Sequence, residues 1–337
     1  MSVATAAETR RHGSGWPRHL LDVNDLSDEA LERILRRAET HRAGLDRRHA
    51  PEQELSRRRV ALLFAEPSTR TRLSFEIAAR NLGAEVLVLE PGASSLVKGE
   101  SLADTARTLD ALGADFLVLR HHRSGAPWVA ARHFSRSVVN AGDGWHAHPT
   151  QALLDLFTLR RALGTHDLRG RKIAIVGDLR HSRVARSNAW TLTCAGADVW
   201  ACAPPELLRG FESLAEELPA DRRLTLTDQL PAALADADAV MALRMQFERM
   251  SRRQPSRAEY VTRYQIDERR LAGAAPGAFL LHPGPVNEGI EVTREVARGP
   301  RSLVLEQVRN GVPLRMAVLG GLLPDAQDIR EGFSARR

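Results

Sequence analysis

The feature that most constrains the fold is a regular alternation of short apolar runs with longer amphipathic segments. Segments with helical spacing, such as Leu102, Ala106, Leu109 and Leu112, separate the runs. Strands that alternate with helices in this way form parallel sheets covered by helices, so we predict an α/β protein with two doubly wound parallel-sheet domains. The apolar, β-branched runs expected to be buried strands are 60–64, 85–89, 116–119, 138–141, 173–176, 199–203, 239–243 and 279–281.

The length of 337 residues suits two such domains, each with its own core. We expect a disordered tail over residues 1–17, a first domain over 18–150 and a second over 151–304. The segment 149–163 has the pattern of a helix and is expected to carry the connection between the domains. A C-terminal helix over 305–325 is expected to pack back on the first domain.

Composition excludes several functional classes. No run approaches the ~18 apolar residues of a membrane span, and no secretory signal is evident, so we expect a cytoplasmic protein. The net charge of +6 comes from scattered basic residues without interleaved aromatics, which argues against nucleic acid and fits small anionic substrates. Cys194 and Cys202 stand alone, so neither a metal site nor a disulfide framework is expected.

A polar stretch follows the first predicted strand and precedes a predicted helix. It reads Ser68-Thr69-Arg70-Thr71-Arg72. Hydroxyls and backbone N–H groups at a helix N-terminus favour an anion, and the Arg70 guanidinium adds a planar donor for phosphate oxygens. The alternative is that Ser68 or Thr69 only caps the helix and the arginines are solvated. On these residues alone, the two interpretations are equally supported.

Two further cations could reach the same anion. Arg120 ends a predicted strand and so lies at the carboxyl edge of the sheet, where open α/β folds bind ligands. Of the 48 basic residues only Lys98 and Lys172 are lysines, and Lys98 occurs in a Gly/Ser-rich loop where arginine would fit equally well. This selective use of lysine favours a functional role for Lys98 over chance, whereas Arg120 alone could be a surface residue.

The segment 140–151 concentrates polar groups between a predicted strand and a predicted helix. His148 could donate a hydrogen bond to a carbonyl oxygen that gains charge in a transition state, and Gln151 could accept one from an amide nitrogen. A lone histidine in such a loop is more often structural. Together the two residues are candidates for binding a carbonyl group that carries an amide.

Arginines in the second half suit a dicarboxylic ligand. Arg183 follows a turn at 177–182 that lacks the glycine spacing of a dinucleotide site, so no nucleotide cofactor is expected. Arg244 and Gln246 come at the end of another predicted strand. Two arginines for two carboxylates predict a dicarboxylic acceptor, although either one alone is more often a surface charge.

The last predicted strand is followed by His282-Pro283-Gly284-Pro285. Its prolines lack N–H donors and stiffen the turn, so its free carbonyls could hold an NH2 group. Taken by itself, a rigid surface turn is the simpler interpretation.

Together these segments closely resemble the catalytic chains of the aspartate/ornithine carbamoyltransferase family, and within it the aspartate carbamoyltransferases. The resemblance spans residues 18–325, and six ordered motifs are strong evidence against chance agreement. The motifs are Ser68-Thr69-Arg70-Thr71-Arg72, Lys98-Gly99-Glu100-Ser101, His148-Pro149-Thr150-Gln151, His181-Ser182-Arg183, Arg244-Met245-Gln246 and His282-Pro283-Gly284-Pro285.

The resemblance implies carbamoyl transfer from carbamoyl phosphate to L-aspartate, the second step of de novo pyrimidine biosynthesis. In the family the leaving phosphate accepts the proton, so no cofactor, metal or protein base is implied, and catalysis rests on positioning and charge stabilisation. Catalytic roles are implied for Arg70, Thr71, Lys98, Arg120 and His148. Binding of carbamoyl phosphate is implied for Ser68, Thr69, Arg70, Thr71, Arg120, His148, Gln151, Pro283 and Gly284. Binding of aspartate is implied for Lys98, Arg183, Arg244 and Gln246.

The resemblance also implies an assembly. In the family, residues corresponding to Ser95 and Lys98 reach into the active site of an adjacent subunit, so a homotrimer with shared sites is expected and a monomer should be inactive. Whether Ser94 or Ser95 contacts phosphate is open, as is association with regulatory or dihydroorotase chains. Gly284 stands where some members have leucine, which makes the turn looser.

Two alternatives remain at this stage. Ornithine carbamoyltransferases share the phosphate loop, but they typically carry a cysteine in the motif that here contains Thr150, and a Cys-Leu pair in the segment that here contains Gly284. Arg244 would also repel a cationic acceptor. A non-catalytic scaffold subunit of the same fold would have little need for Lys98, Arg120, His148 and Arg244 together.

Overall fold

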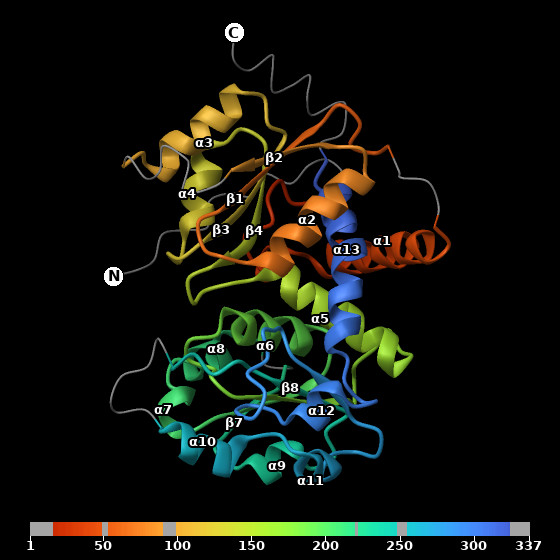
Figure 1. Ribbon diagram of the computed structural model, residues 1–337, viewed down its shortest axis with the longest axis vertical. Helices are drawn as coiled ribbons and strands as arrows, with labels where there is room; N and C mark the ends of the chain where they lie inside the picture. The colour runs from red at the N-terminus through yellow and green to blue at the C-terminus, as the bar shows by residue number, and fades with distance from the viewer. Residues whose placement is uncertain (1–15, 49–52, 90–98, 220–221, 248–254, 324–337) are drawn as a thin grey trace. The chain divides into compact units, whose positions relative to one another are not determined.

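The computed structural model describes residues 16–48, 53–89, 99–219, 222–247 and 255–323. The chain divides into two compact units: unit 1 comprises residues 1–150 and 311–337, and unit 2 comprises residues 151–310. The chain passes from unit 1 to unit 2 within α5 (Pro149–Leu163) and returns within α13 (Val304–Gly321). Each unit contains one parallel sheet with helices packed on it, which confirms the predicted α/β class (Figure 1).

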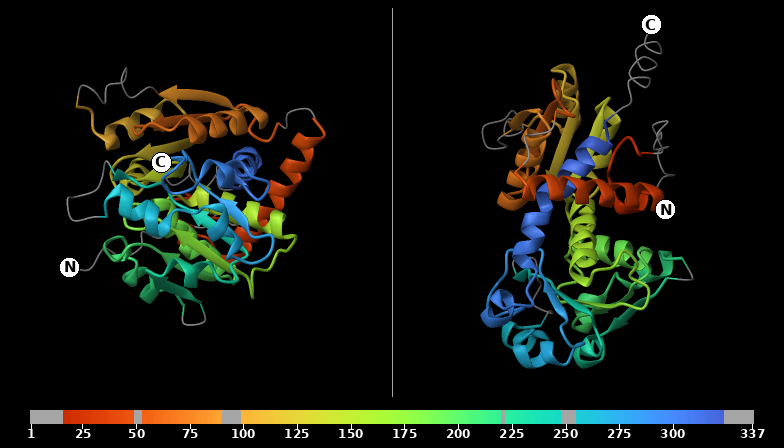
Figure 2. Two further views of the ribbon diagram at one scale, coloured as in Figure 1. Left: turned by 60° about the horizontal axis from the view of Figure 1, so that its bottom comes forward. Right: turned by 90° about the vertical axis from the view of Figure 1, so that its right-hand side faces the viewer.

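The sheet of unit 1 has four strands in the order β2-β1-β3-β4, and every neighbouring pair is parallel. The helices α3 and α4 lie on one side of this sheet (Figure 1), and the course of the chain can be followed in Figure 2. The strands are β1 (Arg59–Phe64), β2 (Glu85–Leu89), β3 (Phe116–His121) and β4 (Ser137–Asp143). The helices are η1 (Val23–Asp25), α1 (Asp28–Asp46), α2 (Thr69–Asn81), α3 (Leu102–Ala111) and α4 (Ala126–His133).

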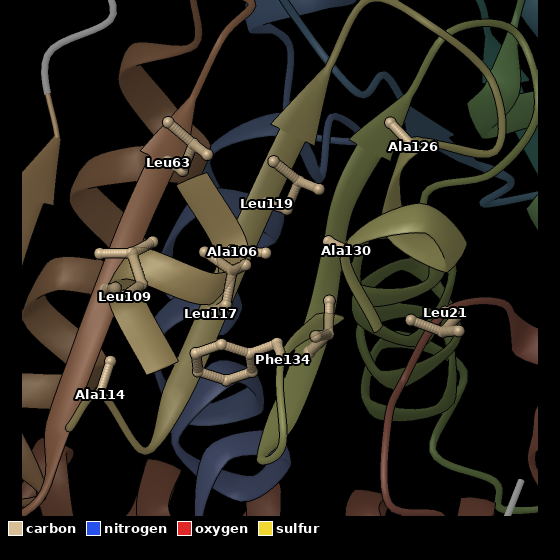
Figure 3. Close-up of a cluster of buried hydrophobic side chains, with 12 residues drawn as sticks. Leu21, Leu63, Ala106, Leu109, Ala114, Leu117, Leu119, Ala126, Ala130 and Phe134 are labelled. Carbon is tan, nitrogen blue, oxygen red and sulfur yellow. The ribbon is translucent and has the colours of Figure 1, made fainter. Parts of the chain in front are cut away.

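The core of unit 1 explains why its strands could be predicted from the sequence. Alternate strand residues such as Leu63 and Leu119 point to the face covered by α3 and α4, where they meet Leu109, Ala130 and Phe134 (Figure 3). All five are at most 4% exposed. Strands covered on both faces read as continuous apolar runs, and this burial is what holds the sheet in place.

Unit 2 contains a five-stranded parallel sheet in the order β7-β6-β5-β8-β9. Its strands are β5 (Lys172–Val176), β6 (Asp198–Cys202), β7 (Leu224–Thr227), β8 (Ala239–Ala242) and β9 (Phe279–Leu281). Its helices are α6 (Arg183–Cys194), α7 (Pro205–Leu208), α8 (Glu212–Glu217), α9 (Leu230–Leu234), α10 (Arg257–Tyr264), α11 (Glu268–Ala272) and α12 (Arg294–Arg298). The sequence analysis did not predict β7, because this short edge strand is only half-buried and half of its residues are threonines.

The ends of the described chain differ slightly from the expected domain limits. Residues 1–15 lie outside the described residues, and the indole of Trp16 is already buried, with the Arg33 guanidinium 4.8 Å from its ring centroid. At the other end, the last turns of α13 belong to unit 1, where Leu314 and Val318 are fully buried. Among the described helices, none combines the length and the apolar character needed to cross a membrane.

The parallel sheets decide where the polar motifs gather. Carboxyl ends of parallel strands meet at one edge, and the loops that leave them hold the ligand sites of open α/β folds. In unit 1 these loops follow β1, β3 and β4. In unit 2 they follow β5, β8 and β9, which are neighbours in the sheet. Each set of predicted site residues therefore lies at one edge of its own sheet.

Candidate functional site

The N-terminus of α2 carries the predicted phosphate loop. Ser68 occupies the cap position with an extended backbone (φ −162°), and its side chain makes no capping hydrogen bond to the described helix. Thr69 and Arg70 are exposed, while Thr71 is buried. Partial desolvation of the guanidinium lowers the pKa of Arg70 from its usual value. Because the Ser68 hydroxyl is not used as a cap, the geometry favours an anion site over the simple cap interpretation.

Arg120 is held beside this loop by an ion pair. Its Nη2 lies 2.8 Å from Glu66 Oε1, and its Nη1 donates to the carbonyl of Ala141 at 3.4 Å. Glu66 precedes Ser68 by only two residues, so the pair brings a second cation to the start of α2. Both side chains are largely buried, which strengthens their attraction.

His148 is buried at the end of a loop that follows β4. Asp143, itself fully buried, organises this loop: its carboxylate accepts from the side-chain amide of Asn140 at 2.8 Å, from the backbone N–H of Ala147 at 3.1 Å and from that of Gly125 at 2.7 Å. Sequence analysis gave Asp143 no role; two of its partners lie close to it in sequence, but the third, Gly125, lies 18 residues earlier. The loop is therefore rigidly shaped up to the residue before His148.

Gln151 lies on α5 in unit 2 and is buried. Its Nε2 donates to Asp155 Oδ1 at 2.8 Å, one helical turn further on. Because a carboxylate only accepts, this contact assigns the amide end of Gln151 and leaves Oε1 as the end for other partners. The role of Gln151 as an acceptor for a ligand stays a prediction.

Two loops of unit 2 carry the predicted acceptor site and are tied together. Arg183 is the first residue of α6, whose cap is Ser182, and it is 8% exposed. Gln246 donates from its side chain to the carbonyl of His181 at 2.9 Å and from its backbone to Asp178 Oδ2 at 3.3 Å. The His181 ring is in turn 2.8 Å from Asp178 Oδ1. The loops that follow β5 and β8 are thus held as one structure, and Arg244, which is half-buried, lies in the second of them, two residues before Gln246.

The turn after β9 is fixed by a buried histidine and carboxylate. Glu291, fully buried, has its Oε1 3.2 Å from His282 Nε2 and 2.6 Å from the backbone N of Asn287. The other ring nitrogen, Nδ1, accepts from the backbone N–H of Gly284 at 2.8 Å. The Asn287 side chain donates to the carbonyl of Met245 at 3.4 Å. Pro283 and Gly284 are therefore held in place, next to the loop that carries Arg244 and Gln246.

Three residues of the predicted site belong to the segment before α3. Ser94, Ser95 and Lys98 lie outside the described residues, and the description resumes at Gly99, two residues before the Ser101 cap of α3. Within the described ranges, no three His, Cys, Asp or Glu side chains are grouped so that they could hold a metal ion.

Comparison with known proteins identifies the family. The model of the aspartate/ornithine carbamoyltransferase carbamoyl-P binding domain matches residues 18–161, and the model of the Asp/Orn binding domain matches residues 169–322. The chain belongs to the aspartate/ornithine carbamoyltransferase family. The carbamoyl-P model ends within α5, and the Asp/Orn model ends one residue after α13; the chain passes between the units within these two helices.

Individual carbamoyltransferases are similar over most of the chain. The aspartate carbamoyltransferase catalytic subunit of Roseiflexus sp. (strain RS-1) is 49% identical over 320 residues, which cover 95% of this chain and 98% of that protein. The crystal structure of aspartate transcarbamoylase from Trypanosoma cruzi in complex with aspartate and phosphate has a TM-score of 0.79 at 31% identity, with 91% of this chain and 95% of that one covered. Ornithine carbamoyltransferase from Pyrococcus furiosus has a TM-score of 0.80 at 28% identity, with 92% and 97% covered. The carbamoyltransferase fold therefore does not by itself choose between the two acceptors.

Proposed function

We propose that this protein is the catalytic subunit of an aspartate carbamoyltransferase, which makes N-carbamoyl-L-aspartate and phosphate in the second step of de novo pyrimidine biosynthesis. The observation that carries the choice of acceptor is the pair of arginines, Arg183 and Arg244, on two loops of unit 2 that Gln246, His181 and Asp178 tie together. Two cations at one sheet edge suit a dicarboxylate and would repel the ammonium group of ornithine. The 49% identity to an aspartate carbamoyltransferase catalytic subunit supports the same choice.

Unit 1 is proposed to bind the phosphate and to activate the carbonyl group. Arg70 and Arg120 would neutralise the charge of the phosphate, and the hydroxyls at the start of α2 would donate hydrogen bonds to its oxygens. The carbonyl oxygen would accept hydrogen bonds from Thr71, Arg120 and His148. The amine of aspartate attacks the carbonyl carbon, and the resulting tetrahedral oxyanion is stabilised by these donors. The carbon–oxygen bond to phosphate then breaks, and the leaving phosphate takes the amine proton. The residues proposed to bind phosphate are Ser68, Thr69, Arg70, Thr71 and Arg120.

Unit 2 is proposed to hold the other two parts of the substrates. Gln151 Oε1 and the carbonyls of Pro283 and Gly284 would accept from the carbamoyl NH2. Arg183 would bind the α-carboxylate of aspartate, and Arg244 with Gln246 the β-carboxylate. Holding both reactants in a fixed geometry lowers the barrier by removing the entropy cost of their encounter.

A carbamoylation assay tests the proposal directly. The purified protein is given carbamoyl phosphate with either L-aspartate or L-ornithine, and the carbamoylated product is measured. We expect product with aspartate and none above background with ornithine. Product from ornithine alone would overturn the acceptor assignment, and no product from either would overturn the proposed enzyme.

We further propose that the protein acts in the cytoplasm as a homotrimer in which Ser95 and Lys98 complete the site of a neighbouring subunit. The support is the family membership, since both residues lie outside the described part of the chain. Lys98→Ala and Arg120→Ala chains should each be inactive, and mixing them should restore activity in hybrid trimers that contain one intact site. Mixed trimers without any recovered activity would contradict shared sites.

A further inference from the structure

A buried carboxylate in unit 2 orients three side-chain amides. Asp155, on α5, is fully buried. Its Oδ1 accepts from Gln151 Nε2 at 2.8 Å and from Gln307 Nε2 at 2.7 Å, and its Oδ2 accepts from Asn188 Nδ2 at 2.8 Å. The three donors come from α5, α13 and α6. A carboxylate has no proton to donate, so each amide must turn its NH2 group toward Asp155.

This orientation decides what Gln151 and Gln307 offer elsewhere. With its NH2 group turned toward Asp155, Gln151 directs its carbonyl oxygen away from the carboxylate, so Oε1 is the end that can face a ligand. Gln307 likewise presents Oε1, which accepts from the backbone N–H of His282 at 3.0 Å. The same carboxylate therefore fixes both the acceptor on α5 and the first residue of the turn that contains Pro283 and Gly284.

The turn itself offers no backbone donors. The N–H of His282 is donated to Gln307, and the N–H of Gly284 is donated to the ring of His282 at 2.8 Å. Pro283 and Pro285 have no N–H group. Residues 282–285 can therefore present only carbonyl oxygens to a ligand. Together with Gln151 Oε1, these backbone carbonyls form a set of hydrogen-bond acceptors.

We propose that Asp155 is a positioning residue that turns acceptor oxygens toward the amide-binding part of the site, and so selects a carbamoyl phosphate over an acyl phosphate. The inference rests on the proposed function, because it assigns the carbamoyl NH2 to Gln151 and to this turn. The methyl group of acetyl phosphate is close in size to NH2 but donates nothing, so it would leave these acceptors unpaired. A site that is built to bond a polar group discriminates strongly against an analogue that lacks the group.

The test variant is Asp155→Asn, which keeps the shape but removes the charge and allows Gln151 to turn either end toward the ligand. The matched control is Thr158→Val. Thr158 is buried one turn further along α5, where its hydroxyl accepts from Asn310 at 3.1 Å, and it makes no described contact with Gln151 or with residues 282–285. Both substitutions remove buried hydrogen bonds between α5 and α13, so a purely structural effect should appear in both.

The measurement is the inhibition constant of acetyl phosphate, as a competitor, divided by the KM for carbamoyl phosphate. In the wild-type protein this ratio should be large, and in Asp155→Asn it should fall at least about tenfold, because one polar contact to the ligand loses its fixed direction. Thr158→Val should lower the melting temperature and leave the ratio unchanged. A ratio in Asp155→Asn equal to that of the wild type would overturn the proposal.

A second variant covers the case in which Asp155→Asn does not fold. Gln307→Met removes the bond to His282 and one donor to Asp155, and it should raise the KM for carbamoyl phosphate while the KM for aspartate changes less. Equal changes in both constants would count against the proposal. If the wild-type protein makes no carbamoyl aspartate, the proposed function itself is rejected. If it makes the product but the ratio of the two constants is the same in wild type and variant, only the role of Asp155 is rejected.

Discussion

The two units build their parts of the candidate site by different means. In unit 1 the groups are cations and hydroxyls at the ends of elements, with Arg70 exposed and Arg120 paired to a neighbouring carboxylate. In unit 2, besides the cations Arg183 and Arg244, neutral amides, carbonyls and a histidine are oriented by the buried carboxylates of Asp155, Asp178 and Glu291. The attraction between charges depends only weakly on orientation, whereas amides and carbonyls bind a ligand only if their donor or acceptor atom faces it. Unit 1 should therefore be sensitive to loss of charge, and unit 2 to loss of buried partners.

The largest effect on activity is expected in unit 1. Arg70→Ala should lower kcat/KM about 10² to 10³-fold, because it removes a donor to charge that develops on the leaving phosphate. Stability should change by no more than about 0.5 kcal/mol, since the side chain is exposed. The control is Arg80→Ala, which loses an exposed pair with Glu76 in the last turn of the same helix. Steady-state kinetics and urea unfolding measure both quantities, and a loss of stability comparable to the loss of activity would break the distinction.

An intermediate effect is expected from His282 in unit 2, where activity and stability should fall together. In His282→Asn the side-chain oxygen can still accept from Gly284, but the bond to Glu291 is lost. In His282→Gln the longer side chain can still donate to Glu291, but the acceptor for Gly284 is lost. A buried partner left unsatisfied costs about 1–3 kcal/mol.

We therefore expect His282→Asn to lose more stability, and His282→Gln to show the larger rise in the KM for carbamoyl phosphate. Urea unfolding and initial-rate kinetics measure the two effects. Glu288→Gln, which loses an exposed ion pair with Arg298 in the same segment, should change neither. Identical behaviour of the two His282 variants would show that the two ring contacts do not act separately.

The smallest effect on activity is expected at Asp22 in unit 1. Burial raises the pKa of this carboxyl to about 6 from 3.8, against the opposing effect of His146. The folded state then binds the proton more tightly than the unfolded state, so the stability that this group contributes is present below about pH 4 and is lost as the pH rises to about 6. Asn at position 22 can still accept from the backbone N–H of Val23.

Asp22→Asn should therefore gain stability relative to the wild type between pH 4 and pH 7, by at most about 3 kcal/mol. Urea unfolding at several pH values measures this gain, and carbamoylation at neutral pH should be unchanged. A stability difference independent of pH would show that Asp22 does not titrate in this range.

The fold could be predicted well because buried positions are apolar, and this pattern is visible in the sequence. The runs that became β1, β3 and β5 are apolar on both faces, and the spacing of Leu102, Ala106 and Leu109 has one helical interpretation. Strand β7 was not predicted, because a half-buried edge strand has a weaker hydrophobic pattern in its sequence. The candidate cations were predicted in the same way, since arginines that follow parallel strands lie at one edge of a sheet.

The carboxylates that orient the site could not be found from the sequence. Asp155 lies between two leucines of a helix, and two of its partners, Asn188 and Gln307, are distant in sequence. Glu291 follows β9 in a segment with no regular pattern and contacts His282, nine residues earlier. Such contacts form only when the chain has folded. A single sequence therefore shows where an acidic residue occurs, but not which groups it will bond to.

The return of α13 to unit 1 has a consequence for how the protein is made. Arg315 donates to the Ser74 hydroxyl at 2.8 Å, and the Ser137 hydroxyl donates to the carbonyl of Leu322 at 3.0 Å. Unit 2 is continuous in sequence, whereas unit 1 is built from residues on both sides of unit 2, so unit 1 cannot be completed until residues beyond unit 2 have been translated. A stop codon near residue 311 would therefore spare the later-translated unit and leave the earlier one without part of its core.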